Sequence, residues 1–489
     1  MNKLYLPLAV LITLAAWLLW PTTPQQAAAP AASFPTTLET VVNAMPARRQ
    51  LDIQRWQTDA GSRVLFVRTE QLPMLDVRLV FDAGSARDGE HAGLASLTNA
   101  MLDQGADGLD VGEIARGFED LGAAFGTSSH RDMALITLTT LSDAEFREPA
   151  LALLRRIIHA PDFPEDALDR LRTQRLQSLR MQQQVPGPQL ARAFNTLLFG
   201  EHPYAIPSGG TAESLPALAP AHLARFYQQY YTGANAVIAL VGDITEEQAR
   251  TIAEALSEAL PQGERAARLP VAATLVERRT THIDFPSSQT HISLGNQLIQ
   301  RGHEDYVPLY VGNHILGGGG FSAILMDEVR QKRGLVYGVS SHISPMASGG
   351  PFSVSLQTAN SNADDALALT LALIQDFVDN GPTPAQLQLA IDDLTGSFAL
   401  ATASNRDIVG QLGAMGFYDL PLGYLDDFQH AIGEVTAEQI RAAFQRHLNP
   451  EHLAIASIGP RAPDPAGSGT EAEKETETEA ETDSGAARQ

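Results

Sequence analysis

Apolar residues follow two spacings along residues 38–460, and each spacing predicts one kind of element. Segments with apolar residues at every second position, or at nearly every position, predict strands; the clearest are Val77–Ser85, Met133–Leu141, Thr290–Leu298 and Pro351–Thr358. Segments with apolar residues three or four apart predict helices. Because strands and helices do not alternate strictly, we expect an α+β fold in which helices pack on mainly antiparallel sheets.

The same pattern occurs twice. Phe226–Ile244 resembles Phe444–Pro460, since each is a helix end, a polar turn, an apolar run rich in β-formers and a glycine. Asp162–Leu171 and Asn380–Ala390 are proline-marked helix starts that lie at a similar offset. The pairs Phe226/Phe444 and Gly242/Gly459, together with the pair of helix starts, keep one order and a nearly constant offset, which indicates duplication of a unit of roughly 220 residues. We therefore expect a first unit at 38–260 and a second at 271–460, joined by the Pro-, Gly- and charge-rich linker 261–270.

Both ends of the chain differ from these units. Residues 1–22 contain an apolar run, Leu4–Trp20, after one early lysine, which is typical of a signal peptide or an uncleaved signal anchor. A Pro- and Ala-rich linker follows at 23–37. Residues 461–489 are rich in Glu and Thr, and we expect a disordered acidic tail. The N-terminus predicts a periplasmic protein, either released or anchored in the bacterial inner membrane by residues 4–20.

Composition narrows the possible functions. The formal net charge is −23, and no basic footprint is visible, so nucleic-acid binding is excluded. The chain has no cysteine, which excludes disulfides, cysteine-based zinc sites and a cysteine nucleophile. A G-x-S-x-G serine motif is also missing, so an independent hydrolase that uses other residues is disfavoured.

Two longer segments carry a family resemblance. The first is "LGGGGFSAILMDEVRQKRGLVYGVSS" (Leu316–Ser341), and the second is "LFGEHPYAIPSGGTAESL" (Leu198–Leu215). With them, residues 38–460 resemble the insulinase/pitrilysin-type zinc peptidases, or inverzincins, and above all their half-length, processing-peptidase-like members that work as pairs of subunits. The resemblance implies two homologous α+β units that face each other across a cavity.

Active members of that family carry H-x-x-E-H on the first helix of the first unit. Two His at i and i+4 share one helix face and can both bind Zn²⁺, and the Glu beside them can act as general base. Here the aligned segment is the amphipathic stretch "GLASLTNAMLDQG", with Ser96, Asn99 and Ala100 at the three chemical positions. A further Glu ligand is expected 75–80 residues later in the family, yet residues 170–200 contain no acid and offer only glutamines such as Gln174 and Gln177. The resemblance therefore implies a degenerate zinc site, with no metal bound by this chain.

The family's substrate-binding features have counterparts here. In active members an Arg and a Tyr seven residues later orient the scissile carbonyl, and these align with Arg330 and Tyr337. The Gly-rich turn, with Gly318, Gly319 and Gly320, aligns with a loop that contacts substrate in a non-catalytic relative. Read from the residues alone, Arg330 could equally belong to a solvated helix end.

A strand of the first unit that pairs with extended peptide in the family aligns with a stretch that includes Ala124, Phe125 and Gly126. An ordinary edge strand blunted by glycine is the alternative for this stretch. For the scattered histidines, such as His91, His130, His447 and His452, ordinary hydrogen bonding or solvent exposure is the better interpretation.

These features lead to one hypothesis and one alternative. The chain is expected to be a non-catalytic subunit that binds and orients a peptide or unfolded segment for a homologous partner, which supplies H-x-x-E-H and the zinc. Arg330 and Tyr337 would be contributed to the partner's site. The alternative is a peptide-binding or scaffold protein with a peptidase fold and no proteolytic role.

Overall fold

The computed structural model describes residues 51–460, which belong to one compact unit. The segments 1–22, 23–37 and 461–489, for which a signal or anchor, a linker and a disordered tail are expected, lie outside the described residues. Within residues 51–460 none of the helices is both long enough and apolar enough to cross a lipid bilayer. We call residues 51–260 the first half and residues 271–460 the second half.

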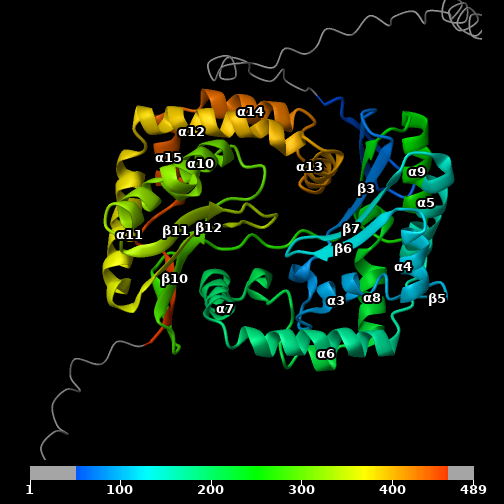
Figure 1. Cartoon of the computed structure of the whole chain (residues 1–489), viewed down its shortest axis with the longest axis horizontal. Helices are drawn as coiled ribbons and strands as arrows, with labels where there is room; N and C mark the ends of the chain where they lie inside the picture. Colours follow the sequence, from blue (N-terminus) through cyan, green and yellow to red (C-terminus); the bar gives the residue numbers. More distant parts are fainter. Residues whose placement is uncertain (1–50, 461–489) are drawn as a thin grey trace, which may run out of the picture. The chain divides into compact units, whose positions relative to one another are not determined.

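Each half contains one large sheet (Figure 1). The first sheet has, in spatial order, β1 (Gln54–Gln57), β2 (Arg63–Arg68), β8 (Ala236–Gly242), β3 (Met74–Phe81), β7 (Ala134–Leu141) and β6 (Ala124–Ser129). The second has β11 (Val336–Ile343), β12 (Pro351–Ala359), β10 (Gln289–Gln297), β13 (Ala454–Gly459) and β9 (Arg279–Asp284). Neighbouring strands are antiparallel except β2 with β8 and β13 with β9. The prediction of an α+β fold with mainly antiparallel sheets is confirmed.

Helices cover these sheets. In the first half they are α3 (Leu94–Ala100), α4 (Val111–Glu119), α5 (Ala144–His159), α6 (Glu165–Gln182), α7 (Pro186–Phe199), α8 (Pro220–Tyr230) and α9 (Glu246–Glu258). In the second half they are α10 (Tyr306–Asn313), α11 (Ala363–Asn380), α12 (Pro384–Ser397), α13 (Asn405–Phe417), α14 (Tyr424–Glu434) and α15 (Ala437–His447). A small hairpin of β4 (Gly105–Ala106) and β5 (Leu109–Asp110) follows α3. The repeated sequence segments form α8–β8 in one half and α15–β13 in the other, as a duplication requires.

Strand β8 is buried on both faces, which its sequence AVIALVG explains. Successive side chains point to opposite faces of a strand. Ile238 and Leu240 therefore pack into the first-half core, while Val237 and Val241 belong to a second core on the other face. That second core is completed by residues of the second half, so another element must cover the outer face of this sheet.

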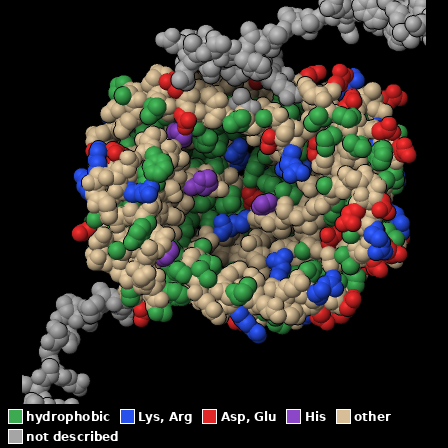
Figure 2. Space-filling view, viewed as in Figure 1, with side chains coloured by type: hydrophobic (Ala, Val, Ile, Leu, Met, Phe, Trp, Pro, Cys, Tyr) green, Lys and Arg blue, Asp and Glu red, His purple; other side chains and the backbone are tan. Residues whose placement is uncertain are grey.

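The covering elements are two helices exchanged between the halves. Helix α13 of the second half packs on β8 and β3 of the first sheet, and α7 of the first half packs on β13 and β10 of the second sheet. Gly416 permits the close approach of α13, because a Cβ there would lie 2.4 Å from a methyl group of Val237. Each sheet is thus completed by a helix of the other half (Figure 1). The space-filling view shows a central hollow (Figure 2).

Asp132 is a buried polar link between the halves. Its carboxylate accepts hydrogen bonds from the Tyr204 hydroxyl, from the backbone N–H of Ala347 at 2.8 Å and from the Tyr418 hydroxyl at 3.3 Å. Tyr204 belongs to the first half, and the other two partners belong to the second. Because buried polar groups need partners, removing one member of this network would leave the others unsatisfied.

Candidate functional site

Helix α3 is the helix that the resemblance equates with the zinc-binding helix of the peptidase family, and Asp88 fixes where it begins. The Asp88 carboxylate accepts hydrogen bonds from the backbone N–H groups of Gly93 and Ala95, both at 2.7 Å. Gly93 precedes the helix with φ of 92°, a left-handed conformation that favours glycine. Burial raises the pKa of Asp88 to about 7, although the two N–H groups act in the opposite direction.

The three chemical positions of α3 have structural partners. The Ser96 hydroxyl donates to the carbonyl of Gly93 at 3.2 Å. Asn99 is 2% exposed, and its amide nitrogen donates to the Leu135 carbonyl and to the Tyr231 hydroxyl, both at 3.2 Å. Ala100 is the last residue of the helix and has no ligand atom. The predicted stripe of Leu94, Leu97 and Met101 is buried in the first-half core.

A cation approaches α3 where the family has its remote zinc ligand. Arg175, on α6, lies 79 residues after Ser96, and its guanidinium donates to the Ser96 hydroxyl at 3.1 Å and to the Ser96 carbonyl at 3.3 Å. Burial lowers the pKa of Arg175, but a guanidinium remains charged in proteins. Gln174 and Gln177, the candidates for this zone in the sequence, are exposed.

These residues do not fit a zinc ion. Zinc in proteins requires imidazole, thiolate or carboxylate ligands, and Ser96, Asn99 and Ala100 offer a hydroxyl, an amide and a methyl group. The nearby Arg175 guanidinium would also repel a metal cation. A neutral amide at position 99 cannot take a proton from water at neutral pH. No step that depends on zinc can therefore be assigned to these residues.

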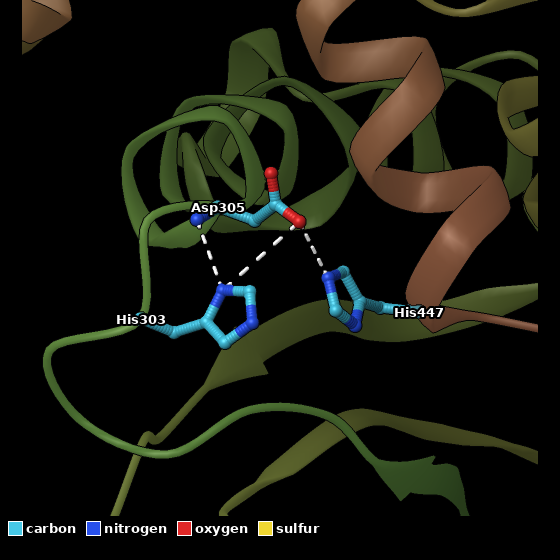
Figure 3. Close-up of side chains that lie close together, drawn as sticks. All are labelled: His303, Asp305 and His447. Carbon is cyan, nitrogen blue, oxygen red and sulfur yellow. Dashed lines mark hydrogen bonds and ion pairs between the residues drawn. The ribbon is translucent and has the colours of Figure 1, made fainter.

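One other cluster, His303, Asp305 and His447, has atoms suitable as metal ligands (Figure 3). Its atoms already have partners: Asp305 Oδ2 accepts from His447 Nε2 at 2.6 Å and is ion-paired with Arg446, and His303 Nδ1 accepts the backbone N–H of Asp305 at 3.0 Å. Burial opposes ionisation of Asp305, but Arg446 and His447 outweigh it and lower the pKa of this carboxyl. The cluster is therefore an ion-pair network in which a guanidinium supplies the positive charge.

Arg330 and Tyr337 lie on different elements. Arg330 is in the π-helical segment Met326–Gln331, with its guanidinium 5.3 Å from the centre of the Phe321 ring. The chain turns at Gly334, with φ of 61°, and Tyr337 follows on β11 with 60% of its surface exposed. Within residues 51–460 Arg330 makes no ion pair, and neither residue is hydrogen-bonded to α3 or α6. A role towards substrate stays a prediction for both.

Packing accounts for part of the Gly-rich turn. A Cβ on Gly317 would lie 2.6 Å from the backbone nitrogen of Ser341 on β11, and Cβ atoms on Gly318 and Gly319 would lie 2.8 Å from atoms of the preceding turn. Gly320 has φ of 63° and open space around the Cβ position. The first three glycines thus permit close packing, and contact of this turn with a peptide stays a prediction.

Ala124, Phe125 and Gly126 lie on β6, the last strand of the first sheet. β6 is hydrogen-bonded to β7 on one side, and it lies beside α3. The ring of Phe125 stacks on Phe118 at 5.2 Å, which holds the strand on the core. This edge could receive an added strand, and peptide binding there stays a prediction.

The sequence interpretation missed Arg175 and Asp88. The spacing of Arg175 from Ser96 falls within the 75–80 residues expected for the remote ligand, so the position could have been found. A cation at that position gives no sign of a metal site, because it is the opposite of a ligand. Asp88 gave no such signal, since one acid before a helix is common on protein surfaces.

Comparison with known proteins gives a consistent result. Residues 63–211 match the family model described as insulinase (peptidase family M16), and residues 217–394 match the model described as peptidase M16 inactive domain. A crystal structure of a peptidase M16 inactive domain from Pseudomonas fluorescens is 46% identical, with a TM-score of 0.82, over 84% of this chain and 99% of that one.

Some relatives are named as zinc proteases and others as non-peptidase homologues. A non-peptidase homolog, YmxG, of Helicobacter pylori is 25% identical over 82% of this chain and 92% of its own length. An uncharacterized zinc protease of Mycobacterium bovis is 30% identical over 58% of this chain. This match spans 65% of the mycobacterial protein, so the activity of that whole protein does not transfer directly.

Proposed function

Because the chain belongs to the insulinase family of peptidases, family M16, and is an inactive M16-like protein, we propose that it is the non-catalytic subunit of a two-chain zinc peptidase. In this proposal it binds a peptide or an unfolded segment and orients it for a homologous partner. The partner carries H-x-x-E-H, the zinc and the general base. The N-terminal segment, residues 4–20, directs the complex to the periplasmic side of the inner membrane.

The main support is the contrast between the two halves. In the first half Arg175 contacts Ser96 on the helix that binds zinc in active members, and Asn99 is buried in the core. In the second half Arg330 makes no ion pair within the described residues, and Tyr337 is largely exposed. The first half therefore lacks metal ligands and a general base at these positions. The second half still has groups that could bind a carbonyl oxygen.

Each retained group has a chemical use. The Arg330 guanidinium is a fixed cation with several donors, and the Tyr337 hydroxyl is a neutral donor. Both can hold a scissile carbonyl and stabilise the oxyanion that forms on it. The free edge of β6 could align an extended substrate beside these groups by backbone hydrogen bonds.

The test is to purify the chain alone and together with a homologue from the same organism that carries H-x-x-E-H. Zinc content and cleavage of unstructured peptides are measured for each preparation. We expect no zinc and no cleavage from the chain alone, and zinc-dependent cleavage from the pair. Zinc-dependent cleavage by this chain alone would overturn the proposal.

In the pair, Arg330→Ala should lower kcat/KM about tenfold or more, because a donor to the developing oxyanion is lost. Arg333→Ala is the matched control, since Arg333 is ion-paired with Glu328 on the same segment. An R330A complex as active as the R333A complex would show that Arg330 has no part in turnover.

A further inference from the structure

Arg175 also lines a cavity of about 320 Å³ between α6, α7 and the loop Ala205–Gly210. Three arginines line it, Arg131, Arg175 and Arg192, and no Asp or Glu does. This concentration of positive charge is unexpected in a chain with a net charge of −23. Basic side chains also border the central hollow in Figure 2, whereas most acidic side chains in that view lie toward the outer margin.

Within residues 51–460 none of the three arginines forms an ion pair. Burial alone lowers the pKa of Arg175, so no acid offsets its desolvation. Burial also lowers the pKa of Arg131, although Tyr204 and Asp132 oppose this effect. The Asp132 carboxylate is itself hydrogen-bonded to Tyr204 and to Ala347. Arg192 is exposed at the rim, where Glu213 of the neighbouring lining acts on it electrostatically. Since a buried charge without a counter-ion is costly, Arg175 above all is placed to receive an anion.

A second cavity of about 490 Å³ extends the first. The two share Leu179, Gln182, Pro188 and Arg192 in their linings, and the second reaches Thr281 and Ile283 of β9. β9 is the last strand of the second sheet. The combined groove therefore has a basic end beside Ser96 and a larger end beside a strand edge, where Glu213 is the one acid in the two linings. Its length suits an extended chain segment rather than a small ion, with the acids of that segment at the basic end.

We propose that this groove binds the acidic C-terminal segment of this chain, residues 471–483, one carboxylate of which is held by Arg175, Arg131 and Arg192. The forked donors of arginine match the two oxygens of a carboxylate. The proposal requires no zinc-bearing partner, so it can fail or succeed independently of the proposed function.

The C-terminal segment matches the groove in charge, because residues 471–483 hold seven acids. That segment follows β13, which packs on α7, the helix that lines both cavities. Ile458 of β13 is also the register partner of Ile283 on β9, which lines the second cavity, so the chain leaves β13 close to the groove.

The experiment measures binding of a labelled peptide with the sequence of residues 471–483, EAEKETETEAETD, by fluorescence anisotropy. The matched control peptide has every Glu replaced by Gln and the Asp by Asn. Both are added to the full chain and to a neutral-tail variant, in which the same seven acids of the chain are replaced in the same way. Measurements at low and high salt report the electrostatic contribution.

We expect the acidic peptide to bind the neutral-tail variant about tenfold or more tightly than the control peptide does, and to bind more weakly at high salt. In the neutral-tail background, Arg175→Gln and Arg192→Gln should each lower this affinity about tenfold. Arg180→Gln should not, since Arg180 is exposed on the same helix and lines neither cavity.

Comparison with the full chain identifies the occupant. Weaker binding to the full chain than to the neutral-tail variant is the expected result, because the chain's own segment then competes for the groove. Equal binding to both would overturn the proposal and indicate that an acidic segment of another protein is the occupant. Equal affinity for the two peptides would overturn the proposal. So would an unchanged affinity in R192Q, whose exposed side chain can be replaced without disturbing the fold.

Discussion

Asn99 occupies the general-base position of α3, but its contacts hold the helix on the core. Its amide donates to the Leu135 carbonyl and to the Tyr231 hydroxyl in a site closed to water. Asn99→Ala should therefore lower the free energy of unfolding by about 1–3 kcal/mol, because two buried acceptors lose their donor. Chemical denaturation measures the change. The control is Tyr231→Phe, which removes one acceptor together with its need for a partner and should therefore lower the free energy of unfolding by less. An N99A variant as stable as the parent would refute this structural role.

Asp88 should make stability depend on pH. Burial raises its pKa from 3.8 to about 7 in the folded protein, so the folded state holds a proton that the unfolded chain has released. The contribution of Asp88 to the free energy of unfolding is fully present below about pH 4 and is lost as pH rises through about 7. The total change is about 2–4 kcal/mol. Asp88→Asn, which does not titrate, should show less of this decline when melting temperatures are followed from pH 4 to 8. Parallel curves for parent and variant would contradict the assignment.

At the scale of elements, the fit of α13 to the first sheet depends on Gly416. A Cβ there would lie 2.4 Å from Val237 Cγ1 and 2.7 Å from Leu65 Cδ1. Alanine favours a helix by about 1 kcal/mol, but overpacking costs about 1–3 kcal/mol, so Gly416→Ala should destabilise the protein on balance. Gly396→Ala on α12 is the control, because its Cβ would meet open space, and it should be neutral or stabilising. Urea denaturation measures the free energy of unfolding of both variants. Equal stability of the two would show that α13 can shift away from the sheet.

Much at this scale could be predicted from the sequence. The four clearest strands, the duplication and the buried stripe of α3 follow from apolar spacing, which reports what lies on an element's own faces. The exchange of α7 and α13 could not be predicted in this way. An apolar stripe shows that a helix packs against something, but it does not identify the sheet. The spacing marks the position of Arg175, but its contact with Ser96 could not be predicted, since that contact depends on how α6 crosses α3.

At the scale of the whole molecule, the exchange makes the halves depend on each other. A fragment of residues 51–260 would lack α13 and expose the outer face of its sheet, including Leu65, Val237 and Val241. A fragment of residues 271–460 would lack α7 and expose Ala456 and Ile458. We expect neither fragment to show a cooperative thermal transition by circular dichroism, and an equimolar mixture to regain one. Cooperative unfolding of either fragment alone would contradict this interdependence.

The exchanged helix α13 also constrains the order of events during synthesis. The strands of the first sheet are complete in the nascent chain once Gly242 has been made, but the helix that covers their outer face ends at Phe417. At about 5–20 residues per second, a ribosome needs on the order of ten to thirty seconds to make the residues between them. Throughout that interval an apolar surface is open to solvent and to neighbouring chains. The newborn protein should therefore depend on a holding chaperone until its second half emerges.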